Sequence, residues 1–145
     1  KSLLAIFAIA ATIVACGKKE KSVSEKFIGN WNGTDNIEIT ITDSTGNTVI
    51  QMLTAPIDFE YLADSTFTAS ITINESITFK FGGVAEITDS IVKMSGTYTA
   101  NSIMDMTGEL ALNEDNSLSI KYFAQNPEAN VIFKGTATVT PKQQQ

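Results

Sequence analysis

Cys16 is the only cysteine in the 145-residue sequence, and it follows an apolar segment that runs from Leu3 to Ala15. A cysteine thiolate is a nucleophile, and in this position it is a candidate for covalent attachment of a lipid. The apolar segment is about a dozen residues long, which is typical of a secretory signal, whereas a helix that crosses a bilayer needs roughly 20. We therefore interpret residues 1–15 as a signal peptide.

The residues around Cys16 resemble the processing site of bacterial lipoproteins. Ile13 is a branched apolar residue three places before the cysteine, Ala15 is small and directly before it, and Gly17 is small and directly after it. The resemblance implies cleavage before Cys16, lipid on its sulfur and an acyl group such as palmitate on the new amino terminus. Several acyl chains hold a protein stably on a membrane, where one binds only marginally. We expect the mature protein to be anchored in the bacterial cell envelope.

Residues 16–26 contain the expected lipidated cysteine and a polar, charged tether with no apolar face to bury. Ser22 and Glu25 have the spacing of a helix cap and its partner, which predicts one helical turn near Lys26. The charges after Cys16 are mostly lysine, whereas some lipoproteins displayed on the cell surface carry an acidic cluster there. We therefore place the protein at the outer membrane, facing the periplasm.

The mature domain lacks the residues of most catalytic and metal sites. It has no cysteine, histidine or arginine, which removes thiolate chemistry, the usual general base near neutral pH and the bidentate guanidinium grip on phosphate. The net charge of −6 repels nucleic acids, so we expect no nucleic-acid partner. The acidic clusters at 43–47 and 113–116 fit solvated turns better than calcium loops. Alternation sends Asp105 and Glu109 outward, so we expect no metal, no cofactor and no catalytic residue.

Alternation of apolar and polar residues with a period of two dominates residues 27–140. In the clearest run, Phe67, Ala69, Ile71 and Ile73 share one face and hydroxyl residues share the other. The pattern predicts an all-β domain, a single antiparallel meander of eight to nine strands, followed by a disordered C-terminal tail at 141–145. Two regions are ambiguous: 49–53, where both faces are apolar, and 56–62, where Pro56 suggests an edge or a bend.

Three glycines fall on the apolar faces of their strands: Gly96, Gly108 and Gly135. Glycine on an inner face permits the sharp coiling that closes a sheet into a barrel. The alternative is a flat sandwich in which the glycines make room for large neighbours such as Phe133. We favour a closed barrel, because closure also removes exposed strand edges.

The domain begins with Phe27, Gly29 and Trp31, a Phe-x-Gly-x-Trp motif at the start of a meander of barrel length. This arrangement resembles the calycin superfamily of lipocalins and fatty-acid-binding proteins. The resemblance implies a lipocalin-like barrel preceded by a short helical turn, with the tryptophan packed across one end. The chain has no arginine to cover that tryptophan, so Lys134 or Lys142 would substitute. Only residues 34–36 separate the motif from the next expected strand, which leaves no room for a helical lid.

Two functions remain open for such a barrel, because eight strands can enclose either a small ligand or only their own side chains. The first is a carrier of a small apolar molecule, with Tyr98 and Tyr122 as inward polar groups. The second is a structural or protein-interaction module of the envelope, an assembly accessory or an enzyme inhibitor, with a solid core. The residues that we expect to line a ligand site are Phe67, Ile71, Phe79, Met94, Tyr98, Met104, Met106, Tyr122 and Phe133.

Overall fold

The computed structural model describes residues 22, 24–88 and 91–143. The expected signal peptide, Cys16, most of the tether and the last two residues of the expected tail lie outside the described residues. Among the described residues there is no α-helix, and therefore no helix of sufficient length and apolarity to span a bilayer.

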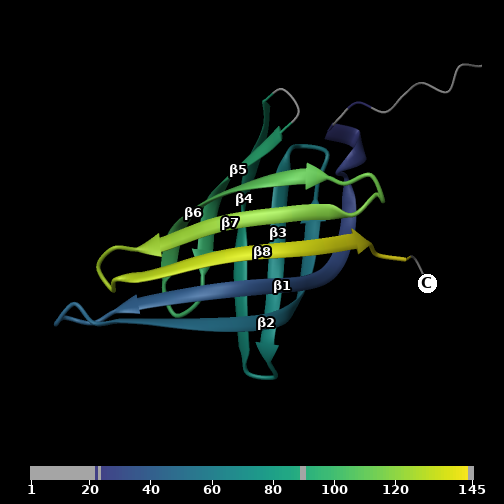
Figure 1. Ribbon diagram of the computed structural model, residues 1–145. Helices are drawn as coiled ribbons and strands as arrows, with labels where there is room; N and C mark the ends of the chain where they lie inside the picture. The colour runs from purple at the N-terminus through teal and green to yellow at the C-terminus, as the bar shows by residue number, and fades with distance from the viewer. Residues whose placement is uncertain (1–21, 23, 89–90, 144–145) are drawn as a thin grey trace, which may run out of the picture.

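Eight antiparallel strands form a closed barrel in which each strand pairs with the next and β8 returns to β1 (Figure 1). The single meander and its closure, both predicted from the alternation and the glycines, are confirmed. A short 3-10 turn, η1, precedes the strands, and in it the Ser22 amide donates to Glu25, as the expected cap requires. The elements are η1 Ser24–Lys26, β1 Gly29–Thr42, β2 Thr48–Tyr61, β3 Thr66–Asn74, β4 Ile77–Thr88, β5 Ile91–Thr99, β6 Ile103–Leu112, β7 Leu118–Asn126 and β8 Val131–Pro141.

The first two strands differ from the prediction. Residues 34–36, expected to separate two strands, lie inside the continuous strand β1, where Asp35 is opposite Ala55. The two ambiguous regions form one strand, β2, and Pro56 lies on the edge that is unpaired within the described chain, next to the β3 pairing, as the expected edge position requires. The barrel also extends one residue past its expected end, because β8 includes Pro141, and the Lys142 amide donates to the Asn30 carbonyl at 2.8 Å.

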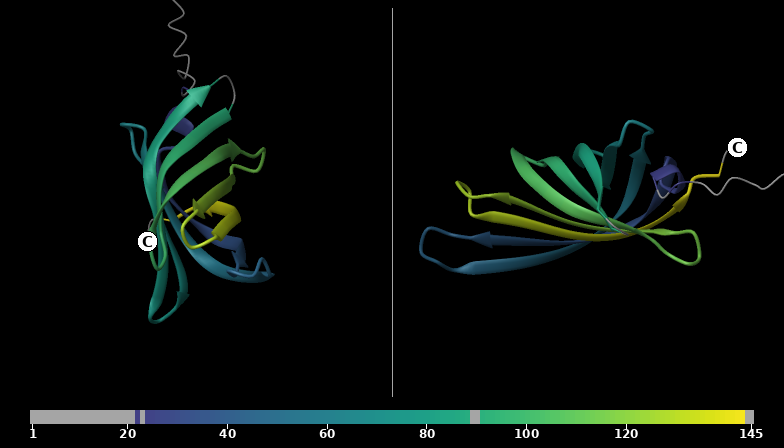
Figure 2. Two further views of the ribbon diagram at one scale, coloured as in Figure 1. Left: turned by 90° about the vertical axis from the view of Figure 1, so that its left-hand side faces the viewer. Right: turned by 90° about the horizontal axis from the view of Figure 1, so that it is seen from above.

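The barrel is strongly flattened and coiled. β3 and β4 cross the direction of β7 and β8 at a steep angle, and the β1–β2 hairpin extends beyond the turn between β7 and β8 (Figures 1 and 2). β1 and β2 have 14 residues each, whereas β3 has nine. The hairpin therefore projects from the end of the barrel opposite to η1.

Glycines on the inner face lie where backbone or rings approach most closely. Gly96 is directly opposite Gly83 between β4 and β5, and a Cβ atom on Gly96 would overlap the Gly82 carbonyl. A Cβ atom on Gly135 would overlap the ring of Tyr122. These two positions have no room for a side chain, which is the physical basis of the glycine pattern read from the sequence.

We predict that Gly96→Ala destabilises the barrel by about 1–3 kcal/mol, because the added methyl forces β4 and β5 apart. Its neighbour Thr97 points outward and is exposed, so Thr97→Ala should change stability by only about 0.5 kcal/mol. Urea unfolding followed by Trp31 fluorescence measures both. Equal effects for the two variants would contradict the close approach.

Candidate functional site

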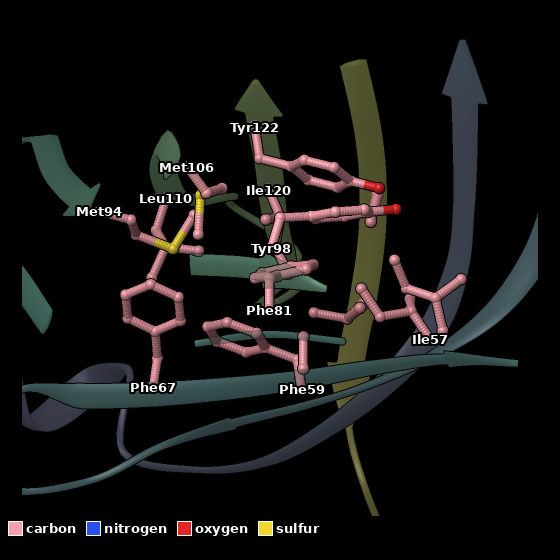
Figure 3. Packing of buried hydrophobic residues seen from close by; sticks show 14 of the residues in the cluster. Ile57, Phe59, Phe67, Phe81, Met94, Tyr98, Met106, Leu110, Ile120 and Tyr122 are labelled. Atoms are coloured by element: carbon pink, nitrogen blue, oxygen red, sulfur yellow. The ribbon is translucent and has the colours of Figure 1, made fainter. Parts of the chain in front are cut away.

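The interior of the barrel is filled by aromatic and sulfur-containing side chains (Figure 3). The rings of Tyr98 and Tyr122 are stacked, with centroids 5.5 Å apart, and Phe81 lies 4.8 Å from Tyr122. Phe133 packs on Tyr98 at 5.0 Å. Contacts of this kind are favourable beyond the area they bury, and they tie β4, β5, β7 and β8 together across the interior.

All nine residues expected to line a ligand site point inward and are at most 9% exposed. They contact one another: Phe79 lies against both Tyr98 and Phe133, and Figure 3 shows Met94 and Met106 beside Leu110. The inward orientation expected from the alternation is therefore present in the structure.

A buried acid lies beside the two tyrosines. Asp35 is fully buried, and the hydroxyl of Tyr122 donates a hydrogen bond of 2.7 Å to its Oδ2. Within the described part of the chain, Asp35 Oδ1 and the hydroxyl oxygens of Tyr98 and Tyr61 have no hydrogen-bond partner. A buried polar atom without a partner is costly, so this group is the least satisfied part of the core.

Burial raises the pKa of Asp35 from 3.8 to about 6, although the hydrogen bond from Tyr122 opposes the shift. Burial also raises the pKa of Tyr122 and of Tyr98 well above 10, so both remain protonated. Among these three described groups inside the barrel, Asp35 is therefore the one that changes its charge closest to neutral pH. In the enclosed, filled interior it has no access to a substrate.

Sequence reasoning missed Asp35, because residues 34–36 were interpreted as a connection. A signal for it was present: Trp31, Gly33, Ile37 and Ile39 share one parity, and an uninterrupted strand puts Asp35 on that same inward face. The two tyrosines, by contrast, were expected as the inward polar groups.

The Phe-x-Gly-x-Trp motif lies at the start of β1. Phe27 and Trp31 are buried, and the Trp31 indole N–H donates to the Phe27 carbonyl at 3.0 Å. Gly29 has a φ of 141°, a backbone conformation that favours glycine. The two lysines expected near Trp31 both form ion pairs, Lys142 with Asp58 at 3.5 Å and Lys134 with Glu38 at 3.3 Å, and Lys142 lines the same hollow as Trp31.

Hollows on the described surface are lined mainly by outward-facing residues. One of them is an open groove of about 690 Å³ across the outer faces of β4 to β8, and the inward residues Met94 and Tyr122 contribute to its lining. One row across this groove alternates in charge, since directly opposite residues on adjacent strands are Glu86, Lys93, Glu109 and Lys121. The described chain has two ion pairs within 4.0 Å, and neither involves these four side chains. Their charges are therefore available to a partner.

The acidic turns use their carboxylates to form the turns themselves. Asp43 Oδ1 accepts bonds from the Thr45 hydroxyl and from the amides of Thr45 and Asn47, which lower the pKa of Asp43 to about 2. Asp64 and Asp115 accept equivalent bonds from Thr66 and Ser117. Among residues 24–88 and 91–143, no three acidic side chains gather as a metal site would require.

Comparison with known proteins identifies the fold and no family. No protein-family model and no curated protein matches the sequence. Among solved structures, the chain is similar to a redesigned β-barrel, with a TM-score of 0.51 and 17% identity. The match covers 83% of this chain and 96% of that one. At this identity the likeness shows a shared β-barrel architecture alone.

We predict that the barrel becomes more stable as the pH falls from 7.5 to 5.0. The folded-state pKa of Asp35, about 6, lies above the value of 3.8 for an unperturbed carboxyl, so the folded protein takes up the proton first. This group should add about 1.4 kcal/mol at pH 5.0 relative to pH 7.5. Asp35→Asn should lose that increment in urea unfolding at the two pH values.

Asp105→Asn is the matched control, because Asp105 points outward and is exposed. The control should retain the full pH dependence. The lowered pKa of Asp43, about 2, acts only at more acidic pH. A pH dependence that survives in Asp35→Asn would contradict the role of Asp35.

Proposed function

We propose that the protein is a lipid-anchored protein of the bacterial cell envelope that acts by binding a protein partner at the outer surface of a solid, lipocalin-like barrel. The observation that carries this proposal is the filled interior: the nine expected lining residues are buried against one another. A carrier of the usual kind encloses a pocket of about 300–1,000 Å³. Here the hollows are lined mainly by outward-facing residues, with Met94 and Tyr122 as two inward residues in the lining of the groove.

The interior polar group supports binding at the surface rather than chemistry inside. Catalysis needs a titratable group that a substrate can reach, and Asp35, Tyr98 and Tyr122 are enclosed. The outward acids Asp105 and Glu109 lie four residues apart on β6, and no cluster of three acids occurs in the described chain. We therefore propose a binding protein, not an enzyme.

The outer groove is the surface that we assign to the partner. Next to its charged row, a second row of directly opposite residues contains Ser95, Thr107, Phe123 and Lys134. Phe123 is 39% exposed, lies directly opposite Lys134 and is two residues from Lys121 on its own strand. An exposed aromatic side chain beside charged residues is a typical anchor for a protein partner, and the alternating charge of the neighbouring row selects for a complementary pattern.

The anchor is proposed from the sequence around Cys16. A polar tether of about ten residues reaches roughly 16–19 Å when flexible, so the barrel would work close to the membrane. Location at the outer membrane and orientation toward the periplasm belong to the same proposal, as does the lipocalin-like character of the Phe27, Gly29 and Trp31 motif.

We predict that cells grown with labelled palmitate incorporate the label into the full-length protein, because Cys16 receives lipid. Cys16→Ser should abolish incorporation. Gly17→Ser keeps a small residue after the cysteine and should retain it. Label in Cys16→Ser equal to that in the unmodified protein would refute lipidation at this residue.

We predict that a photo-crosslinking amino acid in place of Phe123 captures a reproducible envelope protein in intact cells, because Phe123 lies in the groove. The same amino acid in place of Thr138, which is exposed on the outer face of β8 outside the groove, should capture it at most weakly. Mass spectrometry of the crosslinked bands identifies and quantifies the product.

Native mass spectrometry of the purified protein distinguishes the binding module from a carrier. A solid core should give the mass of the chain with its anchor and no further ligand. A bound apolar molecule that is lost on unfolding, together with no specific crosslink at Phe123, would contradict the proposed function.

A further inference from the structure

The outer half of β2 is a free strand edge. β2 pairs with β1 along its whole length, from Thr48 to Tyr61, but with β3 only from Ile57 to Tyr61. Residues 48–56 therefore have a partner strand on one side only within the described chain. In Figure 1 this segment forms the outer edge of the projecting β1–β2 hairpin.

The alternation of hydrogen bonds identifies the backbone groups that this edge presents. The Asp43 amide donates to the Asn47 carbonyl at 2.9 Å, so the odd-numbered residues of β2 bond to β1. The Leu62 amide donates to Thr66, toward β3, which agrees with the same parity. Thr48, Ile50, Met52 and Thr54 thus direct their N–H and C=O groups outward. Pro56 has the same parity and no N–H, so it ends the series of donors.

The side chains along this edge are apolar and uncharged. Val49, Ile50 and Met52 are 61–64% exposed, and they lie on both faces of the hairpin. No residue from Thr48 to Ile57 carries a charge. Exposed edges are usually protected by charged side chains, bulges or a covering segment, and the described part of this edge has none of these before Pro56.

We infer that a second copy of this chain pairs with this edge, strand β2 against strand β2 in antiparallel orientation, to form a homodimer with its two-fold axis at Gln51. In this register Thr48 faces Thr54 and Ile50 faces Met52, so all four outward-directed residues of each copy are used. Such a pairing forms about eight backbone hydrogen bonds. The two hairpins then make one continuous four-stranded sheet.

The register is self-complementary in its side chains as well. Ile50 of one copy lies opposite Met52 of the other on one face, and Val49 lies opposite Leu53 on the other face. Each copy has a net charge of −6, so two copies repel each other over most of their surfaces, and an uncharged edge is where they can meet without that cost. A two-fold axis closes the assembly, because the described part of each copy has one such edge to offer.

Disulfide formation at the two-fold axis tests the register. Gln51 faces its own symmetry mate in a pair without direct backbone bonds, where Cα atoms are about 4.5 Å apart, within disulfide reach. Oxidation of Gln51→Cys in the full chain, in membranes, should give a covalent dimer. Thr54→Cys places a cysteine on the same edge. In this register residue 54 of one copy is offset by six residues from residue 54 of the other, a distance of roughly 20 Å. Thr54→Cys should therefore crosslink at least tenfold less than Gln51→Cys. The unmodified chain controls for any disulfide through Cys16.

Sedimentation of the full chain in detergent tests the assembly without a new cysteine. The unmodified protein should be a dimer, and Met52→Lys should be a monomer, because it puts a charge on the edge of each copy. Ile103→Lys changes a side chain that is 73% exposed and far from β2 in the pairing order, and it should remain a dimer. A monomeric unmodified protein, an open series of larger assemblies, or equal crosslinking of Gln51→Cys and Thr54→Cys would overturn the inference.

Discussion

Tyr122 packs against the backbone of Gly135 beside the β1–β8 pairing that closes the barrel. Tyr122 on β7 is directly opposite Gly135 on β8, and its ring occupies the space where a side chain at 135 would lie. From there the hydroxyl reaches across β8 to Asp35 on β1. One side chain thus connects the last two strands to the first, across the seam at which the sheet closes. A larger residue at 135 would displace the ring and leave Asp35 without this partner.

Filling the interior has an energetic cost as well as a functional consequence. The stacked rings of Tyr98, Tyr122 and Phe81 bury a large apolar area, but they enclose hydroxyl and carboxyl oxygens that lack partners. Burial of the Asp35 carboxyl disfavours its charged form, and the raised pKa of Asp35 measures this cost. Because the rings occupy the centre, we assign the proposed recognition to the outer faces of the strands, where charge alternates across β4 to β7 with no ion pair among these side chains in the described chain.

Period-two alternation predicted most of the fold, since burial of one sheet face imposes that pattern directly on the sequence. The inward glycines predicted closure for the reason that the structure displays, close approach at Gly96 and Gly135. Asp35 was missed because a polar residue on an apolar face looks the same in a sequence as a connection between strands. The free edge of β2 could not be derived either, because it depends on where β3 leaves β2. The apolar character of both faces at 49–53 was nevertheless its visible signal.

Unequal strand lengths produce the free edge in a fold that otherwise removes edges. Closure pairs β1 with β8 as far as Ile41 and Val131, so the projecting hairpin is covered on its β1 side. β3 pairs with only five residues of β2, which leaves the other side of the hairpin open. Val49, Ile50 and Met52 lie on this open segment and outside the buried core, so burial within one barrel does not account for their apolar side chains. Burial against a second copy accounts for these apolar side chains. In the inferred dimer, the open side of the hairpin pairs with another strand, as the strands do in the rest of the sheet.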